Sequence, residues 1–89
     1  MEQLNISANH IQLDAPTTAF AEKKLRKIVK LLPASGQINL TFTLENKLCR
    51  VEAHASMPGK DIHAQATEDD FYISIKEVAE KLFRQLTDV

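Results

Sequence analysis

The sequence has little of several residue types that mark common kinds of site. Its two glycines are too few for a Gly-rich phosphate loop. Its single cysteine, Cys49, cannot form an internal disulfide. No stretch approaches the roughly 20 apolar residues that span a bilayer, and residues 1–5 contain neither a basic leader nor an apolar signal core. These absences predict a cytoplasmic protein that does not act at a membrane.

Neither sign of charge dominates the whole chain. Eleven Lys and Arg residues against twelve Asp and Glu residues give a net charge of −1, which argues against binding nucleic acid through bulk charge. The bases are unevenly spread, however, because residues 22–30 hold five bases and one acid, while residues 68–70 are all acidic. The length of 89 residues predicts one domain over residues 1–89, with a single small core.

Alternation of apolar and polar residues predicts four β-strands. The strands are expected over residues 3–9, 37–44, 49–57 and 61–66. Two-residue turns at Asn46-Lys47 and Pro58-Gly59 would join the last three strands. These turns keep apolar residues opposite one another, as a sheet with one buried face requires. The expected pairs are Leu44 with Cys49, Phe42 with Val51, Leu40 with Ala53, Ala55 with Ile62, and Ala53 with Ala64.

Helical spacing of apolar residues predicts two helices. The first is expected over residues 15–32, with Asp14 as its N-cap and Pro16 in its first turn. The second is expected over residues 68–87, opened by a capping box at Thr67-Glu68-Asp69-Asp70. The resulting order, β-α-β-β-β-α, predicts an α+β fold. Its four-stranded sheet would carry both helices side by side on its one apolar face.

The basic residues of both predicted helices fall outside the apolar sectors. If the helices lie side by side, their outer surfaces form one platform rich in Lys and Arg, although Glu77 and Glu80 share it. Such a surface suits contacts to phosphate groups. The predicted RNA-binding residues are Lys23, Lys24, Arg26, Lys27, Lys30, Lys76, Lys81 and Arg84. The alternative is that these residues are simply the solvated backs of two helices.

Other modes of RNA recognition lack their signals. The chain has no Gly-x-x-Gly loop, and the predicted sheet has no exposed aromatic residues on which bases could stack. Binding is therefore expected to be electrostatic and shape-based, with a partner that is already structured.

The predicted register places His54 opposite His63 on the polar face of the sheet. A cross-strand histidine pair can bind zinc, but a zinc site needs three or four ligands, and only Glu52 and Gln65 lie near. We therefore expect an ordinary cross-strand pair of polar side chains rather than a metal site. Catalysis also lacks support, because no Ser-His-Asp, Cys-His or paired-carboxylate arrangement can be assembled. We therefore expect no enzyme, no cofactor and no small-molecule substrate.

Several segments resemble one family over essentially the whole chain. They are Gln3-Leu4-Asn5-Ile6, residues 20–28, Arg50-Val51-Glu52-Ala53, Pro58-Gly59, residues 70–76 and residues 81–86. In order and spacing they are similar to the short ribosome hibernation-promoting factors and to their relative, ribosome-associated inhibitor A. Where that family often has Ile-Asp in its last helix, this chain has Ile75-Lys76, which adds a base.

The resemblance implies a stress or stationary-phase factor with the β-α-β-β-β-α fold. Its expected partner is the rRNA of the small ribosomal subunit, in the channel used by mRNA and tRNA, where it would silence translation. The free chain is expected to be a monomer. The RNA contacts that the resemblance implies fall on Lys24, Lys27, Lys81 and Arg84. The alternative is a protein-interaction module that modulates an alternative sigma factor, through the polar sheet face or an exposed Ile73.

Overall fold

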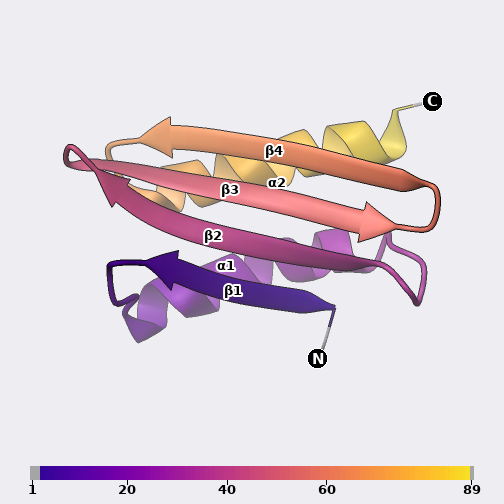
Figure 1. The fold of residues 1–89 in the computed structure, drawn as a ribbon, viewed down its shortest axis with the longest axis horizontal. Coiled ribbons are helices and arrows are strands. Elements are labelled where there is room, and N and C mark those ends of the chain that lie inside the picture. Colours follow the sequence, from indigo (N-terminus) through magenta and orange to yellow (C-terminus); the bar gives the residue numbers. More distant parts are fainter. Residues whose placement is uncertain (1–2, 89) are drawn as a thin grey trace.

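The computed structural model describes residues 3–88. In chain order its elements are β1 (Leu4–Asn9), α1 (Ala15–Val29), β2 (Gln37–Glu45), β3 (Leu48–Met57), β4 (Lys60–Glu68) and α2 (Phe71–Thr87). The predicted β-α-β-β-β-α order is therefore confirmed. The four strands form one layer, and both helices lie behind it on one face (Figure 1).

The strands are arranged in the order β1-β2-β3-β4. β1 pairs with β2 in parallel, whereas the other two pairings are antiparallel. The register of the antiparallel part is the predicted one. Leu44, for example, lies opposite Cys49, and Ala55 lies opposite Ile62. Asn46 and Lys47 have φ angles of 51° and 67°, the left-handed conformation that a tight turn between twisted strands requires.

The core lies between the sheet and the helices. Phe42 and Leu40 from the sheet are fully buried, as are Leu25 of α1 and Ile75 of α2. Burying each such side chain contributes about 1.5–3 kcal/mol. Ser74 fixes the start of α2 to the sheet, because its buried hydroxyl donates a 2.7 Å hydrogen bond to the main-chain oxygen of Cys49.

The predicted end of the first helix is wrong by three residues, because α1 ends at Val29 rather than at residue 32. Beyond it, the amide of Leu31 bonds to the oxygen of Ile28, and that of Leu32 bonds to the oxygen of Val29. These i-to-i−3 bonds tighten the chain into a 3₁₀-like turn. The following residue, Pro33, disfavours the α conformation at the residue before it.

The predicted capping box is also wrong. β4 continues to Glu68, because Arg50 and Cys49 of β3 offer pairing partners to Thr67 and Glu68. The cap of α2 is Asp70, whose carboxylate accepts a 2.6 Å hydrogen bond from the amide of Tyr72. The helix therefore starts at Phe71 rather than at residue 68.

The cap predicted for the first helix is confirmed. Asp14 accepts a 3.0 Å hydrogen bond from the amide of Thr17. Hydrogen bonds from Thr17 lower the pKa of the Asp14 carboxyl, since they favour its ionised form. Within residues 3–88, neither helix is long and apolar enough to span a bilayer.

Candidate nucleic-acid interface

The two helices form a single layer with one outer surface. They run in the same direction, so that their C-terminal ends lie at the same end of the molecule (Figure 1). An aromatic contact joins them, since the ring of Phe20 on α1 meets that of Tyr72 on α2 edge-on at 4.9 Å between centroids. The outer faces of α1 and α2 are therefore neighbours, as the sequence predicted.

The structure places the predicted RNA-binding residues on this outer surface or just beyond it. Seven of the eight are exposed, and Lys30 lies at the C-cap of α1 rather than inside the helix. Lys24 is the exception. It is half-buried, with its ammonium nitrogen 5.5 Å from the centroid of the Phe20 ring. We call the eight residues the basic layer: Lys23, Lys24, Arg26, Lys27, Lys30, Lys76, Lys81 and Arg84.

The charges of the basic layer are not neutralised by ion pairs with residues 3–88. The ion pairs within that range join Arg50 to Glu45 and Glu52, and His54 Nε2 also lies 3.5 Å from a carboxylate oxygen of Asp61. One member of the layer has another partner, because the ammonium group of Lys81 donates a 2.7 Å hydrogen bond to the main-chain oxygen of Gln65. The other seven cations form no ion pair or side-chain hydrogen bond with residues 3–88.

Part of this arrangement has a structural cause. Arg26 and Lys27 lie in the last turn of α1, and Arg84 lies in the last turn of α2. Cations at these positions are favoured by the negative end of the helix dipole, by about 0.3–1 kcal/mol each. Because both helices end on the same side, the cations that their dipoles stabilise lie at the same end of the molecule.

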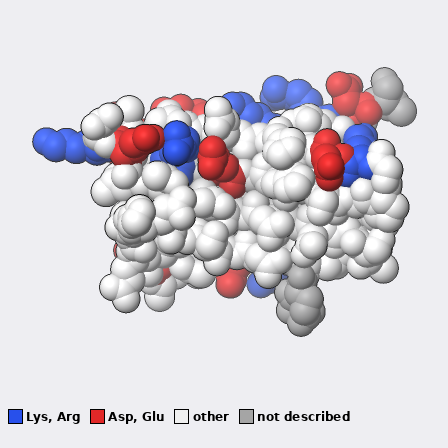
Figure 2. Space-filling model, viewed as in Figure 1, with Lys and Arg blue, Asp and Glu red and all other residues white. Residues whose placement is uncertain are grey.

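The opposite surface, formed by the open face of the sheet, is different in character. Few charged side chains appear on it, and most of it is neutral (Figure 2). The side-chain nitrogen of Asn5 donates a 3.1 Å hydrogen bond to the side-chain oxygen of Asn39, a contact typical of this uncharged polar surface. Arg50 is held by Glu45 at 3.0 Å. The helical side is therefore the better candidate for contacts to phosphate.

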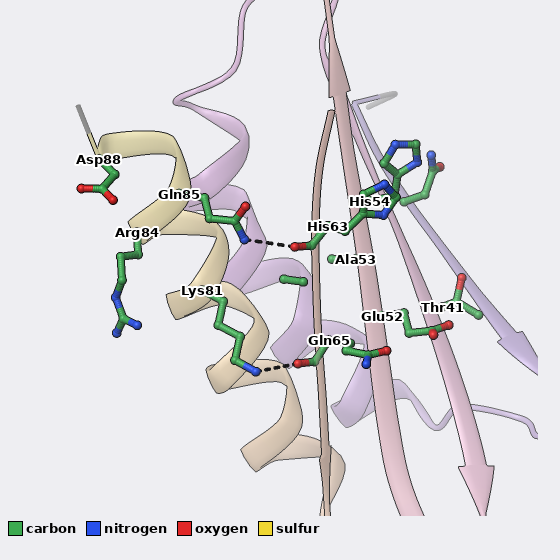
Figure 3. Close-up of a pocket in the computed structure, with 12 residues that line it drawn as sticks. Thr41, Glu52, Ala53, His54, His63, Gln65, Lys81, Arg84, Gln85 and Asp88 are labelled. Carbon is green, nitrogen blue, oxygen red and sulfur yellow. Dashed lines mark hydrogen bonds between the residues drawn. The ribbon is translucent and has the colours of Figure 1, made fainter. Parts of the chain in front are cut away.

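The predicted histidine pair is present on the sheet. The rings of His54 and His63 stack at 4.3 Å between centroids, with 3° between their planes. They line a shallow hollow that continues around β4 toward α2, where Lys81 and Gln85 reach across to the main chain of β4 (Figure 3). Within residues 3–88, no three His, Cys, Asp or Glu residues are grouped closely enough to hold a metal ion.

α2 also carries exposed apolar side chains. Ile73 is 44% exposed, in agreement with the helical wheel. Phe83 is 51% exposed on the same helix and was not predicted as a surface residue. Its position outside the apolar stripe of Phe71, Ile75, Val78, Leu82 and Leu86 was the signal that could have identified it.

Comparison with known proteins places this geometry in one family. The family model described as Sigma 54 modulation protein / S30EA ribosomal protein matches residues 4–89. The ribosome hibernation promoting factor of Pseudomonas putida is 30% identical over 84 residues, covering 94% of this chain and 82% of the relative. That of Escherichia coli K12 is 29% identical over 85 residues, covering 96% and 90% respectively.

Two solved structures share the fold. A ribosomal subunit interface protein from Coxiella burnetii superposes with a TM-score of 0.83 at 24% identity, covering 94% of this chain and 92% of that one. The N-terminal domain of Thermus thermophilus Protein Y gives 0.80 at 18% identity, covering 92% and 91%. Because the family model matches residues 4–89 and the relatives align with most of the chain, the chain belongs to the Sigma 54 modulation protein / S30EA ribosomal protein family.

Proposed function

We propose that this chain is a single ribosome-binding domain that silences translation. In this proposal the basic layer binds rRNA of the small subunit, and the bound chain occupies the channel used by mRNA and tRNA. Family membership supports the prediction that the chain is not an enzyme, since the curated relatives are named ribosome hibernation promoting factors.

The observation that carries the proposal is the separation of charge between the two surfaces. The chain has a net charge of −1, yet α1 alone presents Lys23, Lys24, Arg26 and Lys27 against one acid, Glu22. A surface on two packed helices on which bases outnumber the acids Glu22, Glu77 and Glu80 suits the phosphate backbone of a folded RNA. The neutral sheet face offers no equivalent set of cations.

The test is co-sedimentation of the purified chain with vacant ribosomes and with separated subunits, over a series of salt concentrations. Binding to the small subunit is expected to weaken by roughly 0.7–0.9 log units per tenfold salt for each phosphate neutralised. A chain that occupies the channel should also compete with mRNA and tRNA for vacant subunits. Competition distinguishes this site from rRNA elsewhere on the subunit.

A charge-reversal variant isolates the basic layer. Lys23, Arg26, Lys27 and Arg84 are exposed and make no side-chain hydrogen bond to a described residue, so their joint change to Glu should keep the fold. Glu in the last turns of both helices lowers stability, so circular dichroism must first show that the variant is folded. The control changes Lys47 and Lys60, exposed residues at the two hairpin ends, to Glu, and so carries two charge reversals rather than four. The quadruple variant should lose ribosome binding, and the control should keep it. Retained binding by the quadruple variant would exclude the basic layer as the ribosome-binding surface. Capture of a sigma factor instead of ribosomes would favour the protein-partner alternative.

A further inference from the structure

The two edges of the sheet are protected to different degrees. At the β4 edge, Lys81 donates a hydrogen bond to the main-chain oxygen of Gln65, and Gln85 donates one of 3.0 Å to that of His63 (Figure 3). β4 also carries charged residues at both of its ends, Lys60 and Glu68. Charges and covering side chains are the usual protection against pairing of an edge strand with another chain.

Within residues 3–88, no comparable protection covers the β1 edge. The amide of Ile38 donates a 2.8 Å hydrogen bond to the oxygen of Gln3, and Ile38 pairs with Leu4 in the register. In a parallel ladder the backbone N–H and C=O groups of alternate residues point to the same neighbour. The backbone groups of the odd-numbered residues of β1 therefore point toward β2, and those of Leu4, Ile6 and Ala8 point outward. Nothing among the described side chains bonds to these groups, and β1 contains no charged residue and no proline.

An apolar groove runs beside this edge, between β1 and the start of α1. Its aliphatic side chains are half-buried, packed against the core but still accessible. Among the described residues that line it, one is charged, Glu22 on α1. The aliphatic lining residues are Leu4, Ile6, Ala8, Ile11 and Leu13.

We propose that this edge pairs with the β1 edge of a second copy of the chain. An antiparallel pairing about a two-fold axis at Ile6 places Leu4 opposite Ala8 of the second copy, and Ile6 opposite its equivalent. All three outward-facing residues then become hydrogen-bonded pairs, which gives about six main-chain bonds. The same register places apolar side chains opposite apolar ones on the helix side, and Asn5 opposite Ser7 on the open face. A strand of this sequence is therefore complementary to itself, as a two-fold contact requires.

The dimer is expected to be weak. We expect a contact made by one six-residue strand and the adjoining groove to bury less than the roughly 1,200 Å² of total surface that stable interfaces reach. We expect a dissociation constant of roughly 0.1–1 mM, so that the dilute chain is monomeric, as the sequence predicted. Because the pairing strand carries no charge, added salt should not weaken association, whereas salt weakens rRNA binding. This proposal does not depend on the proposed function.

The test is sedimentation equilibrium of the wild-type chain from about 10 μM to about 2 mM, repeated at high salt. The apparent mass should rise toward twice that of the monomer, and backbone NMR shifts should change with concentration along residues 4–13. An apparent mass that stays at the monomer value up to 2 mM, or concentration-dependent shifts confined to β4 or the helices, would overturn the proposal.

Ala8→Pro tests the edge itself. Ala8 is a small residue whose amide points outward, so proline there removes a donor of the dimer without removing a β1–β2 bond. The matched control is Ala34→Pro. It makes the same chemical change at the second position of the turn closed by the 2.9 Å bond from Gly36 to Pro33, where proline is favoured. Ala8→Pro should abolish association, and Ala34→Pro should retain it.

A charge pair tests the register without touching the backbone. Asn5 and Ser7 are exposed on the open face. The dimer places Asn5 of one copy opposite Ser7 of the other. The double variant N5K/S7K should weaken association at least about tenfold through like charges, as should N5E/S7E. An equimolar mixture of the two should form a heterodimer at least as tight as the wild-type dimer. With both variants shown to be folded by circular dichroism, failure of the mixture to associate would refute this register.

Discussion

The ammonium nitrogen of Lys81 lies 2.7 Å from the main-chain oxygen of Gln65, where it closes part of the β4 edge. The same residue belongs to the basic layer, so it has both a structural partner and a proposed role toward rRNA. A phosphate that approaches α2 must compete with this carbonyl or share the ammonium group with it, since Lys has three donors. Among the eight cations Lys81 is therefore the one whose removal should break a described hydrogen bond as well as weaken binding.

Replacing Lys81 with Met should lower both stability and ribosome affinity. Met keeps the apolar stem but leaves the carbonyl of Gln65 to water, which should cost less than about 1 kcal/mol because the site is exposed. Lys76→Met is the matched control, since Lys76 is exposed on the same helix and makes no side-chain bond to a described residue. Urea denaturation and co-sedimentation should show two losses for Lys81→Met and one, in binding, for Lys76→Met. Equal stabilities of both variants and the wild type would remove the structural role.

Removing one cation of the basic layer should lower the salt dependence of ribosome binding by the amount expected for one phosphate contact. Lys27→Gln removes one exposed cation of the basic layer, so the slope of log affinity against log salt should become shallower by about 0.7–0.9. Lys47→Gln removes a cation in the β2–β3 turn, at the end of the sheet away from the C-termini of the helices, and should leave the slope unchanged (Figure 1). Fluorescence titrations with small subunits at four salt concentrations would measure both. Equal slopes for Lys27→Gln and the wild type would place Lys27 outside the interface.

Much of the fold could be predicted because local patterns and tertiary packing agree. The strict alternation around Phe42 and Val51, with short turns at Asn46-Lys47 and Pro58-Gly59, leaves only one register that buries the apolar side chains. The errors occur where a tertiary partner overrides a local signal. Thr67 has the local sequence of a helix cap, but pairing with Arg50 keeps it in β4.

The candidate site was predictable in composition but not in detail. A helical wheel fixes which side of α1 is buried, so the exposure of Arg26 and Lys27 follows from the burial of Leu25. The hydrogen bond from Lys81 to Gln65 could not be predicted, because it joins two elements whose separation depends on the packing of the whole helix. The open β1 edge likewise follows from a strand order that the sequence pattern did not specify.

Two carboxyl groups near the end of β4 should make stability depend on pH. A hydrogen bond with the carboxyl of Glu77, together with its negative charge, raises the pKa of the Glu68 carboxyl. The folded chain therefore retains a proton that the unfolded chain releases. Stability contributed by this pair is present below the ordinary Glu pKa of about 4.3 and is lost as pH rises through the raised value.

Glu77→Gln should remove this dependence. The amide can still bond to Glu68 but carries no charge, so the Tm at pH 7 should rise relative to the wild type, while the difference at pH 4 should be smaller. Glu80→Gln removes an exposed acid from the same helix and is the control for net charge. Thermal unfolding between pH 4 and pH 7 would measure the effect. Parallel curves for Glu77→Gln and the wild type would show that the two carboxyl groups do not interact.

Cys49 offers a chemical probe of the junction between β3 and α2. Its side chain is 8% exposed, and its thiol lies 3.7 Å from the main-chain oxygen of Asp69. Burial, followed by the negative charges of Asp70 and Asp69, raises the pKa of the Cys49 thiol. The native chain should therefore react with a disulfide reagent at neutral pH at least about tenfold more slowly than the urea-unfolded chain, because only the accessible thiolate attacks.

The same probe should report on the cap of α2. Asp70→Ala removes the acceptor of the Tyr72 amide, so the first turn of the helix should open more often and expose the thiol. The labelling rate at constant pH should rise several-fold, although loss of the Asp70 charge by itself also favours the thiolate. Asp70→Asn separates the two effects, since it removes the charge but keeps a capping oxygen. If Asp70→Asn accelerates labelling as much as Asp70→Ala, the charge controls the thiol; if it does not, opening of the helix start is the rate-limiting event.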